Sequence, residues 1–287
     1  MTKAVLGSKR GFFRGVAVVG LGLVAVAGFF GWQHFYPVQA TSGWDYRVAY
    51  SDIRKAAALG IDEHGNILVS EELRNSQGTL WRIAPDGQRT LLVDKLTKPD
   101  GLTPFLGGHA FSQETANAPV SLLKDGKVTP LFIGQDVQGL KADGPLLYAI
   151  EDRKGDGRLL RYDSRTQALE VVRSGLSESE SVELCGDKML YTVKEQGVVR
   201  QVSANGDDPV HVEGLKEPTF LLCDERGLWI TEDQTHQARL WLLDNSGKLR
   251  VILSNLRAPQ ELLRTGDGQY LLAEGGRDRV LELKVQP

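Results

Sequence analysis

The sequence contains few of the residues from which compact catalytic and metal-binding motifs are built. Its 287 residues include two cysteines and five histidines, too few cysteines for a disulfide framework or a zinc site with four cysteine ligands. No two histidines have the spacing of metal ligands, and the absence of a Gly-x-Ser-x-Gly motif argues against a serine hydrolase. The 34 basic residues are nearly balanced by 37 acidic ones, so we expect no nucleic-acid partner.

Charged residues are also missing from residues 15–44, and Val16–Trp32 is almost wholly apolar. As a helix, this run covers roughly 26 Å at about 1.5 Å per residue, close to the thickness of the hydrocarbon core of a bilayer. Four basic residues precede it, and the next one is Arg47. This asymmetry predicts a cytoplasmic segment (1–14), a transmembrane anchor (15–36), a linker (37–43) and a periplasmic or extracellular domain (44–287).

A cleaved signal peptide is the alternative interpretation of the same segment. Val38-Gln39-Ala40 has the small-x-small pattern of a cleavage site, although the apolar run is longer than a usual signal core. Either interpretation sends the rest of the chain across the membrane. We expect a single-pass protein of the cell membrane if the segment is retained.

The remaining chain repeats with a period of about 40 residues. Short apolar strands begin at intervals of 40, 39, 40, 41 and 40 residues: Leu80–Ile83, Val120–Leu123, Leu159–Tyr162, Val199–Val202, Leu240–Leu243 and Val280–Leu283. Each follows a two-strand unit and most precede a turn and a further strand. Six four-stranded units predict an all-β, six-bladed β-propeller. The sixth unit ends after its third strand, and residues 45–50 have the composition to supply its missing outer strand; a superhelical solenoid would leave this segment unexplained.

The repeats resemble the NHL-repeat and senescence-marker-protein–gluconolactonase superfamily of six-bladed propellers, and Lys98-Pro99-Asp100-Gly101-Leu102 resembles its Pro-Asp-Gly-apolar motif. The resemblance implies a divalent cation, calcium above all, that activates a lactone or ester, with Asp100 among its ligands. The chain departs from the family pattern because no Asn-Gly motif opens any inner strand.

Two positions of each repeat are expected at one mouth of the central channel, because the first two strands of a blade are antiparallel. Counted from the inner apolar residue, position −2 holds Ala57, Asp100, Gln138, Glu180, Pro218 and Gln260. Position +12 holds Glu71, Glu114, Asp152, Lys194, Glu232 and Glu274. This alignment predicts a carboxylate-rich ring, broken by Lys194, that holds a metal or cationic ligand. Solvated carboxylates at strand ends are the alternative. The candidate binding residues are Asp100, Glu180, Glu71, Glu114, Glu232 and Glu274.

Cys185 and Cys223 fall at equivalent positions of inner strands in adjacent blades. They could form a disulfide in an oxidising compartment or remain two buried thiols.

Two functions are compatible with these features. The first is a membrane-anchored extracytoplasmic propeller that binds a small-molecule ligand or a protein partner at the acidic mouth. The second is a metal-dependent lactonase or esterase in which the cation polarises the carbonyl and a mouth carboxylate acts as base. A lyase similar to strictosidine synthase, with Glu232 or Glu274 as its catalytic carboxylate, is a third class. Propellers host all three activities, so the fold does not decide among them.

Overall fold

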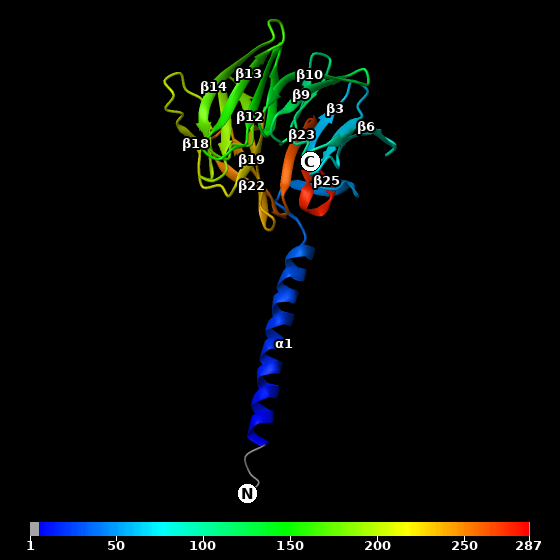
Figure 1. The fold of residues 1–287 in the computed structure, drawn as a ribbon, viewed down its shortest axis with the longest axis vertical. Helices are drawn as coiled ribbons and strands as arrows, with labels where there is room; N and C mark the ends of the chain where they lie inside the picture. The colour runs from blue at the N-terminus through cyan, green and yellow to red at the C-terminus, as the bar shows by residue number, and fades with distance from the viewer. Residues whose placement is uncertain (1–5, 287) are drawn as a thin grey trace. The chain divides into compact units, whose positions relative to one another are not determined.

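The structure is a computed structural model that describes residues 6–286 (Figure 1). The chain divides into two compact units, one up to Val38 and one from Gln39 onward. The first contains helix α1 (Leu6–Phe35), in which Arg14–Trp32 has a mean hydropathy of 2.0 and is long enough to cross a membrane. A signal sequence has the same properties. Within this unit the apolar side chains are exposed, with Val18 at 70% and Leu21 at 71%. Lys3, one of the four basic residues that precede the apolar run, lies outside the described residues.

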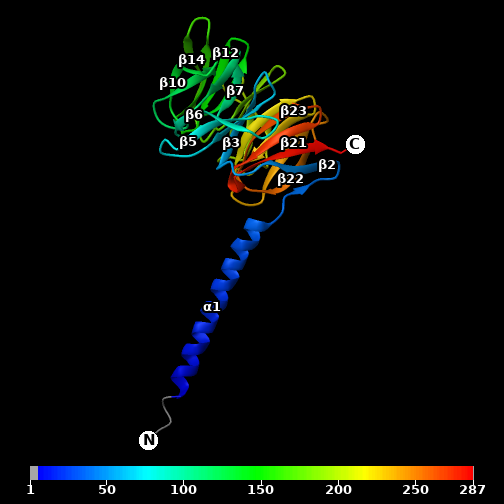
Figure 2. The same cartoon turned by 90° about the vertical axis from the view of Figure 1, so that its right-hand side faces the viewer.

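From Gln39 onward the chain forms six antiparallel sheets, which confirms the predicted all-β propeller of four-stranded blades (Figures 1 and 2). Blade one contains β3 (Ala56–Ile61), β4 (Ile67–Glu71), β5 (Gly78–Ile83) and β6 (Arg89–Leu96). Blade two contains β7 (Leu102–Phe105), β8 (Gly108–Phe111), β9 (Ala118–Lys124) and β10 (Lys127–Gly134). Blade three contains β11 (Val137–Asp143), β12 (Leu146–Glu151), β13 (Gly157–Asp163) and β14 (Ala168–Leu176).

The other three blades follow the same order, with two additions from the start of this unit. Blade four contains β15 (Val182–Cys185), β16 (Lys188–Val193), β17 (Val198–Gln201) and β18 (Val210–Val212). Blade five contains β19 (Pro218–Asp224), β20 (Gly227–Glu232), β21 (Ala238–Asp244), β22 (Leu249–Leu256) and the added β1 (Gln39–Ala40). Blade six contains β23 (Pro259–Gly266), β24 (Gln269–Glu274), β25 (Arg279–Val285) and β2 (Trp44–Tyr50), with the short 3₁₀ helix η1 (Gly275–Arg277) between β24 and β25.

The propeller is closed by pairing between the two ends of this unit. Strand β2 lies antiparallel to β25, with Trp44 opposite Val285 and Val48 opposite Leu281 (Figure 2). This pairing covers an edge of β25 that would otherwise be open. The segment expected to be a linker is partly ordered on a neighbouring blade, because β1 pairs with β22 and the Thr41 N–H donates to the Ile252 carbonyl at 2.9 Å.

The inner segments of neighbouring blades approach one another closely, and glycine permits this at two places. A Cβ atom on Gly101 would lie 2.2 Å from the carbonyl oxygen of Gln138, and one on Gly139 would lie 2.5 Å from that of Glu180. Both distances are too short for a side chain, so blades two, three and four pack together only with glycine there. These glycines immediately follow Asp100 and Gln138, whose positions they therefore help to set.

The two cysteines form a disulfide in the structure. Cys185 lies at the end of β15 and Cys223 near the end of β19, with their Cα atoms 5.4 Å apart. The bond joins the inner strands of blades four and five.

A buried glutamate near the end of the second strand stabilises four of the blades. Glu71, Glu151, Glu232 and Glu274 are each 5% exposed or less. Each accepts a hydrogen bond from the backbone N–H of a residue in the loop that leads into its blade, at 2.9, 3.0, 2.8 and 2.9 Å respectively. Each also binds an arginine: Glu232 accepts hydrogen bonds from two of the three side-chain nitrogens of Arg239, Nε and Nη2, both at 2.7 Å. We call these four residues the clamp glutamates.

We expect Glu232→Ala to reduce the free energy of unfolding by about 3 kcal/mol or more, because it leaves Arg239 and the Lys216 N–H without their partner. The adjacent Asp233→Ala is the matched control and should cost less than about 1 kcal/mol, because Asp233 is partly exposed and Lys194 retains Glu180. Chemical denaturation of both variants measures the difference. Equal losses would show that the clamp has no special role.

Candidate functional site

One backbone hydrogen bond recurs in all six blades at one mouth of the channel, and it shows which residues of different blades are equivalent. A residue one to three positions after the second strand donates its N–H to a carbonyl in the loop before the first strand. The six donors are Glu72, Glu114, Asp152, Lys194, Asp233 and Gly275. The six acceptors are Lys55, Lys98, Asp136, Glu178, Glu217 and Ala258, all with φ between 41° and 49°. Two residues after each acceptor come Ala57, Asp100, Gln138, Glu180, Thr219 and Gln260.

The structure places the residues of the predicted ring in two different environments. Asp100, Glu114 and Glu180 line a common cavity, together with Gln138, Asp152, Lys194 and Gln260. The other three predicted residues, Glu71, Glu232 and Glu274, are clamp glutamates. The residue that follows each of them in the sequence occupies the donor position at the mouth. In blades one and six the hairpin is one residue longer than in the others. In blade five the apolar residue equivalent to Leu59 of blade one is Leu221 rather than Phe220, so Thr219 takes the position that the alignment gave to Pro218.

The sequence analysis missed Glu72, Asp233, Lys55, Arg74 and Lys98, which also line the cavity. A signal for two of them exists: adjacent acidic residues occur as Glu71-Glu72, Glu151-Asp152 and Glu232-Asp233. In each pair the first residue is a clamp glutamate and the second faces the mouth.

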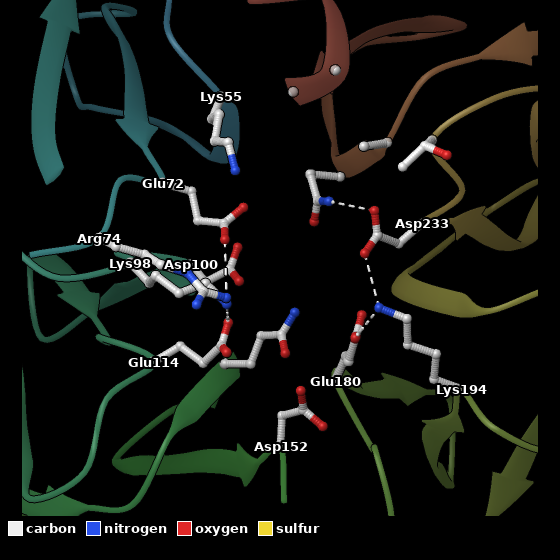
Figure 3. Close-up of a pocket in the computed structure, with 16 residues that line it drawn as sticks. Lys55, Glu72, Arg74, Lys98, Asp100, Glu114, Asp152, Glu180, Lys194 and Asp233 are labelled. Atoms are coloured by element: carbon white, nitrogen blue, oxygen red, sulfur yellow. Dashed lines mark hydrogen bonds and ion pairs between the residues drawn. The ribbon is translucent and has the colours of Figure 1, made fainter.

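The cavity has a volume of about 460 Å³ and charged side chains project into it from several blades (Figure 3). On one side, Lys98 contacts Glu114 and lies 3.4 Å from Glu72. Burial lowers the pKa of Lys98, but the charges of Glu114, Asp100 and Glu72 outweigh this effect and raise it. Burial also raises the pKa of Asp100 well above its ordinary value, and repulsion from Glu72 and Glu114 adds to this.

A second lysine is held in the same way on the other side of the opening. The Nζ atom of Lys194 lies 2.6 Å from Oε1 of Glu180 and 2.8 Å from Oδ2 of Asp233 (Figure 3). Gln260 donates to the other oxygen of Asp233 at 3.2 Å. Complete burial raises the pKa of Glu180 to about 8, with Lys194 opposing the shift and Asp233 adding to it. The two carboxylates therefore share one ammonium group.

Five buried oxygen atoms on residues that line this cavity lack a hydrogen-bond donor among the described residues. They are Oδ1 of Asp100, Oε1 of Gln138, Oδ1 of Asp152, Oε2 of Glu180 and Oε1 of Gln260. Four of these side chains are 5% exposed or less. Asp152 has its pKa raised to about 6, mainly by burial and then by the charge of Glu114. The cavity thus presents acceptors that a donor-rich or cationic group would satisfy.

Three carboxylates at the mouth lie close enough together to share a cation. Oxygens of Glu72, Asp100 and Glu114 lie within 4.8 Å of one another, and oxygen ligands suit Ca²⁺ or Mg²⁺. The donor set fits such an ion in chemical type, and Oδ1 of Asp100 is unpaired. However, the Lys98 ammonium already contacts Glu72 and Glu114, so a metal ion must compete with it.

No protein-family model and no curated protein matches the sequence. Solved structures do match: a gluconolactonase from Xanthomonas campestris has a TM-score of 0.69 at 12% identity, covering 87% of this chain and 95% of that one. An auxiliary nutrient binding protein from Bacteroides thetaiotaomicron has a TM-score of 0.63 at 13% identity (81% and 69% covered). Virginiamycin B lyase from Staphylococcus aureus has a TM-score of 0.59 at 11% identity (85% and 100% covered). These identities establish the fold alone, and the chain has the six-bladed propeller fold of gluconolactonase-like proteins.

Proposed function

We propose that the protein binds a small polar ligand in the cavity at the channel mouth. The observation that carries this proposal is a group of five buried acceptor oxygens that have no donor among the described residues and that all belong to residues lining one cavity. A buried acceptor without a partner costs about 1 to 3 kcal/mol, and a ligand that supplies donors recovers part of this cost. The cavity volume of about 460 Å³ lies within the range of small-molecule sites, which favours a small ligand over a protein partner.

Screening the full chain, purified in detergent, by thermal unfolding against polyols, sugar acids, lactones and amines tests this proposal. A ligand at about 100 times its Kd stabilises the folded protein by about 2.7 kcal/mol. We expect Glu180→Gln to weaken the response to the active compound, because Glu180 lines the cavity. Asp187→Asn, in an exposed turn after β15, is the matched control and should respond like the wild type. A response that Glu180→Gln leaves unchanged would place the ligand elsewhere, and no response to any compound would contradict the proposal.

A metal-dependent lactonase or esterase is the second candidate, favoured by the proximity of Glu72, Asp100 and Glu114. These three residues would hold the cation, with Ca²⁺ the best match for an all-oxygen donor set. Such a cation would polarise the carbonyl of a lactone or ester when bound. Because Lys98 contacts two of the three carboxylates, we place this function second.

Replacing Lys98 distinguishes the ligand-binding function from the metal-dependent hydrolase. We expect Ca²⁺ to leave the thermal midpoint of the wild type unchanged and to raise that of Lys98→Met saturably, because the variant frees two carboxylates from an ammonium group. Lys127→Met, at an exposed position of β10, is the control and should resemble the wild type. A saturable shift of the wild type that Asp100→Ala abolishes, together with lactone or ester hydrolysis, would instead establish the metal-dependent hydrolase.

We further propose that α1 anchors the chain in the cell membrane and that the propeller lies on the extracytoplasmic side. The apolar span Arg14–Trp32 and the basic residues before it support this orientation. The disulfide Cys185–Cys223 suits an oxidising compartment.

Maleimide labelling of the cysteines and extraction of membranes at alkaline pH test the location. We expect labelling only after reduction and denaturation, and a full-length chain that stays with the membrane. A soluble chain that begins at Thr41 would show cleavage of a signal peptide. Labelling without a reductant would contradict an oxidising location.

A further inference from the structure

The two sides of the cavity differ in charge. Blades one and two contribute three cations and three carboxylates: Lys55, Arg74 and Lys98, with Glu72, Asp100 and Glu114. Blades three, four and five contribute one cation, Lys194, against Asp152, Glu180 and Asp233. The second side therefore has more acidic than basic side chains, and this excess remains when Glu180, whose pKa is raised to about 8, is protonated. A ligand that complements both sides must itself be asymmetric in charge.

This side of the cavity also contains acceptors that have no donor among the described residues. Asp152 and Glu180 line the same side of the cavity (Figure 3), and each has one oxygen without a donor among the described residues. Lys194 is already shared between Glu180 and Asp233. An ammonium group placed against Asp152 and Glu180 would supply a positive charge that complements these two acidic side chains.

Across the cavity, Lys55 and Arg74 are exposed at the rim of blade one. Among residues 6–286, neither side chain has a hydrogen bond or ion pair to another residue, whereas Lys98 beside them is held by Glu72 and Glu114. A guanidinium group and an ammonium group at one rim suit a carboxylate, which arginine binds through two parallel hydrogen bonds.

We propose that the ligand is a zwitterion that carries an amine and a carboxylate at opposite ends. Its ammonium group binds Asp152 and Glu180, and its carboxylate binds Lys55 and Arg74. This assignment rests on the proposed function of the mouth, and it narrows the ligand class from polar small molecules to amino acids and related compounds. It leaves Lys98 and Lys194 in place as parts of the cavity wall.

Calorimetric titration of the full chain in detergent with matched probes tests the assignment. The probes are ω-amino acids of four, six and eight carbons, each compared with the alkylamine and the alkanoate of the same length. We expect one ω-amino acid to bind at least about 10-fold more tightly than either singly charged probe, a difference of about 1.4 kcal/mol. A series of lengths is used because the carboxylate must reach the opposite rim.

Two variants test which residues bind the carboxylate and which bind the ammonium group of the ligand. Arg74→Gln should reduce the affinity for the ω-amino acid about 10-fold or more and leave the alkylamine unchanged, whereas Asp152→Asn should weaken both. Arg161→Gln, at a partly exposed arginine paired with Glu170, and Asp187→Asn, at an exposed turn, are the controls, because neither residue lines the cavity. Preserved thermal midpoints without ligand would show that each variant is folded.

Three results would overturn the assignment: an alkylamine that binds as tightly as the ω-amino acid, an Arg74→Gln variant with unchanged affinities, or no binding by any of these probes. They do not by themselves overturn the proposed function. If a polyol or sugar acid stabilises the wild type but not Glu180→Gln, the mouth is a ligand site and only the zwitterion class is wrong.

Discussion

The bidentate contact between a buried glutamate and an arginine, shown most fully by Glu232 and Arg239, fixes where the second strand of a blade ends. The same carboxylate accepts a hydrogen bond from the loop that enters the blade. Because successive residues of a strand point in opposite directions, holding Glu232 inside the blade places Asp233 at the mouth. The location of the charged cavity thus depends on a group that takes no part in lining it.

The mouth combines charges that are satisfied with acceptors that are not. Lys98 and Lys194 each lie between carboxylates, so the cavity contains its own cations. The unpaired oxygens of Asp100, Gln138 and Glu180 remain beside them. Buried polar groups in folded proteins are normally paired, and a cluster of exceptions around one cavity is a feature of binding sites rather than of structural cores. The gluconolactonase-like fold accommodates such a site without determining its chemistry.

The 40-residue period was sufficient to predict the six blades, because strand and turn patterns repeat along the chain. The inner positions of Asp100 and Glu180 also followed from it. One added residue in the hairpins of blades one and six could not be detected from apolar alternation, since it lies in the turn between β3 and β4 in blade one and at a register shift between Arg264 and Gly266 in blade six. It exchanges Glu71 for Glu72 at the mouth. The pairing of Lys98 with acidic neighbours depends on side-chain direction in three dimensions, which spacing does not reveal.

A crystal structure of the full-length protein in a lipid mesophase, at a resolution that shows ordered solvent and small molecules, tests the central claim most directly. If the channel mouth is a ligand site, we expect it to be open, with a ligand, ion or ordered water in contact with Oδ1 of Asp100, Oε1 of Gln138 and Oε2 of Glu180. Lys98 and Lys194 would remain bound to their carboxylates. A closed mouth, with these three oxygens bonded to donors of the protein itself, would contradict the account.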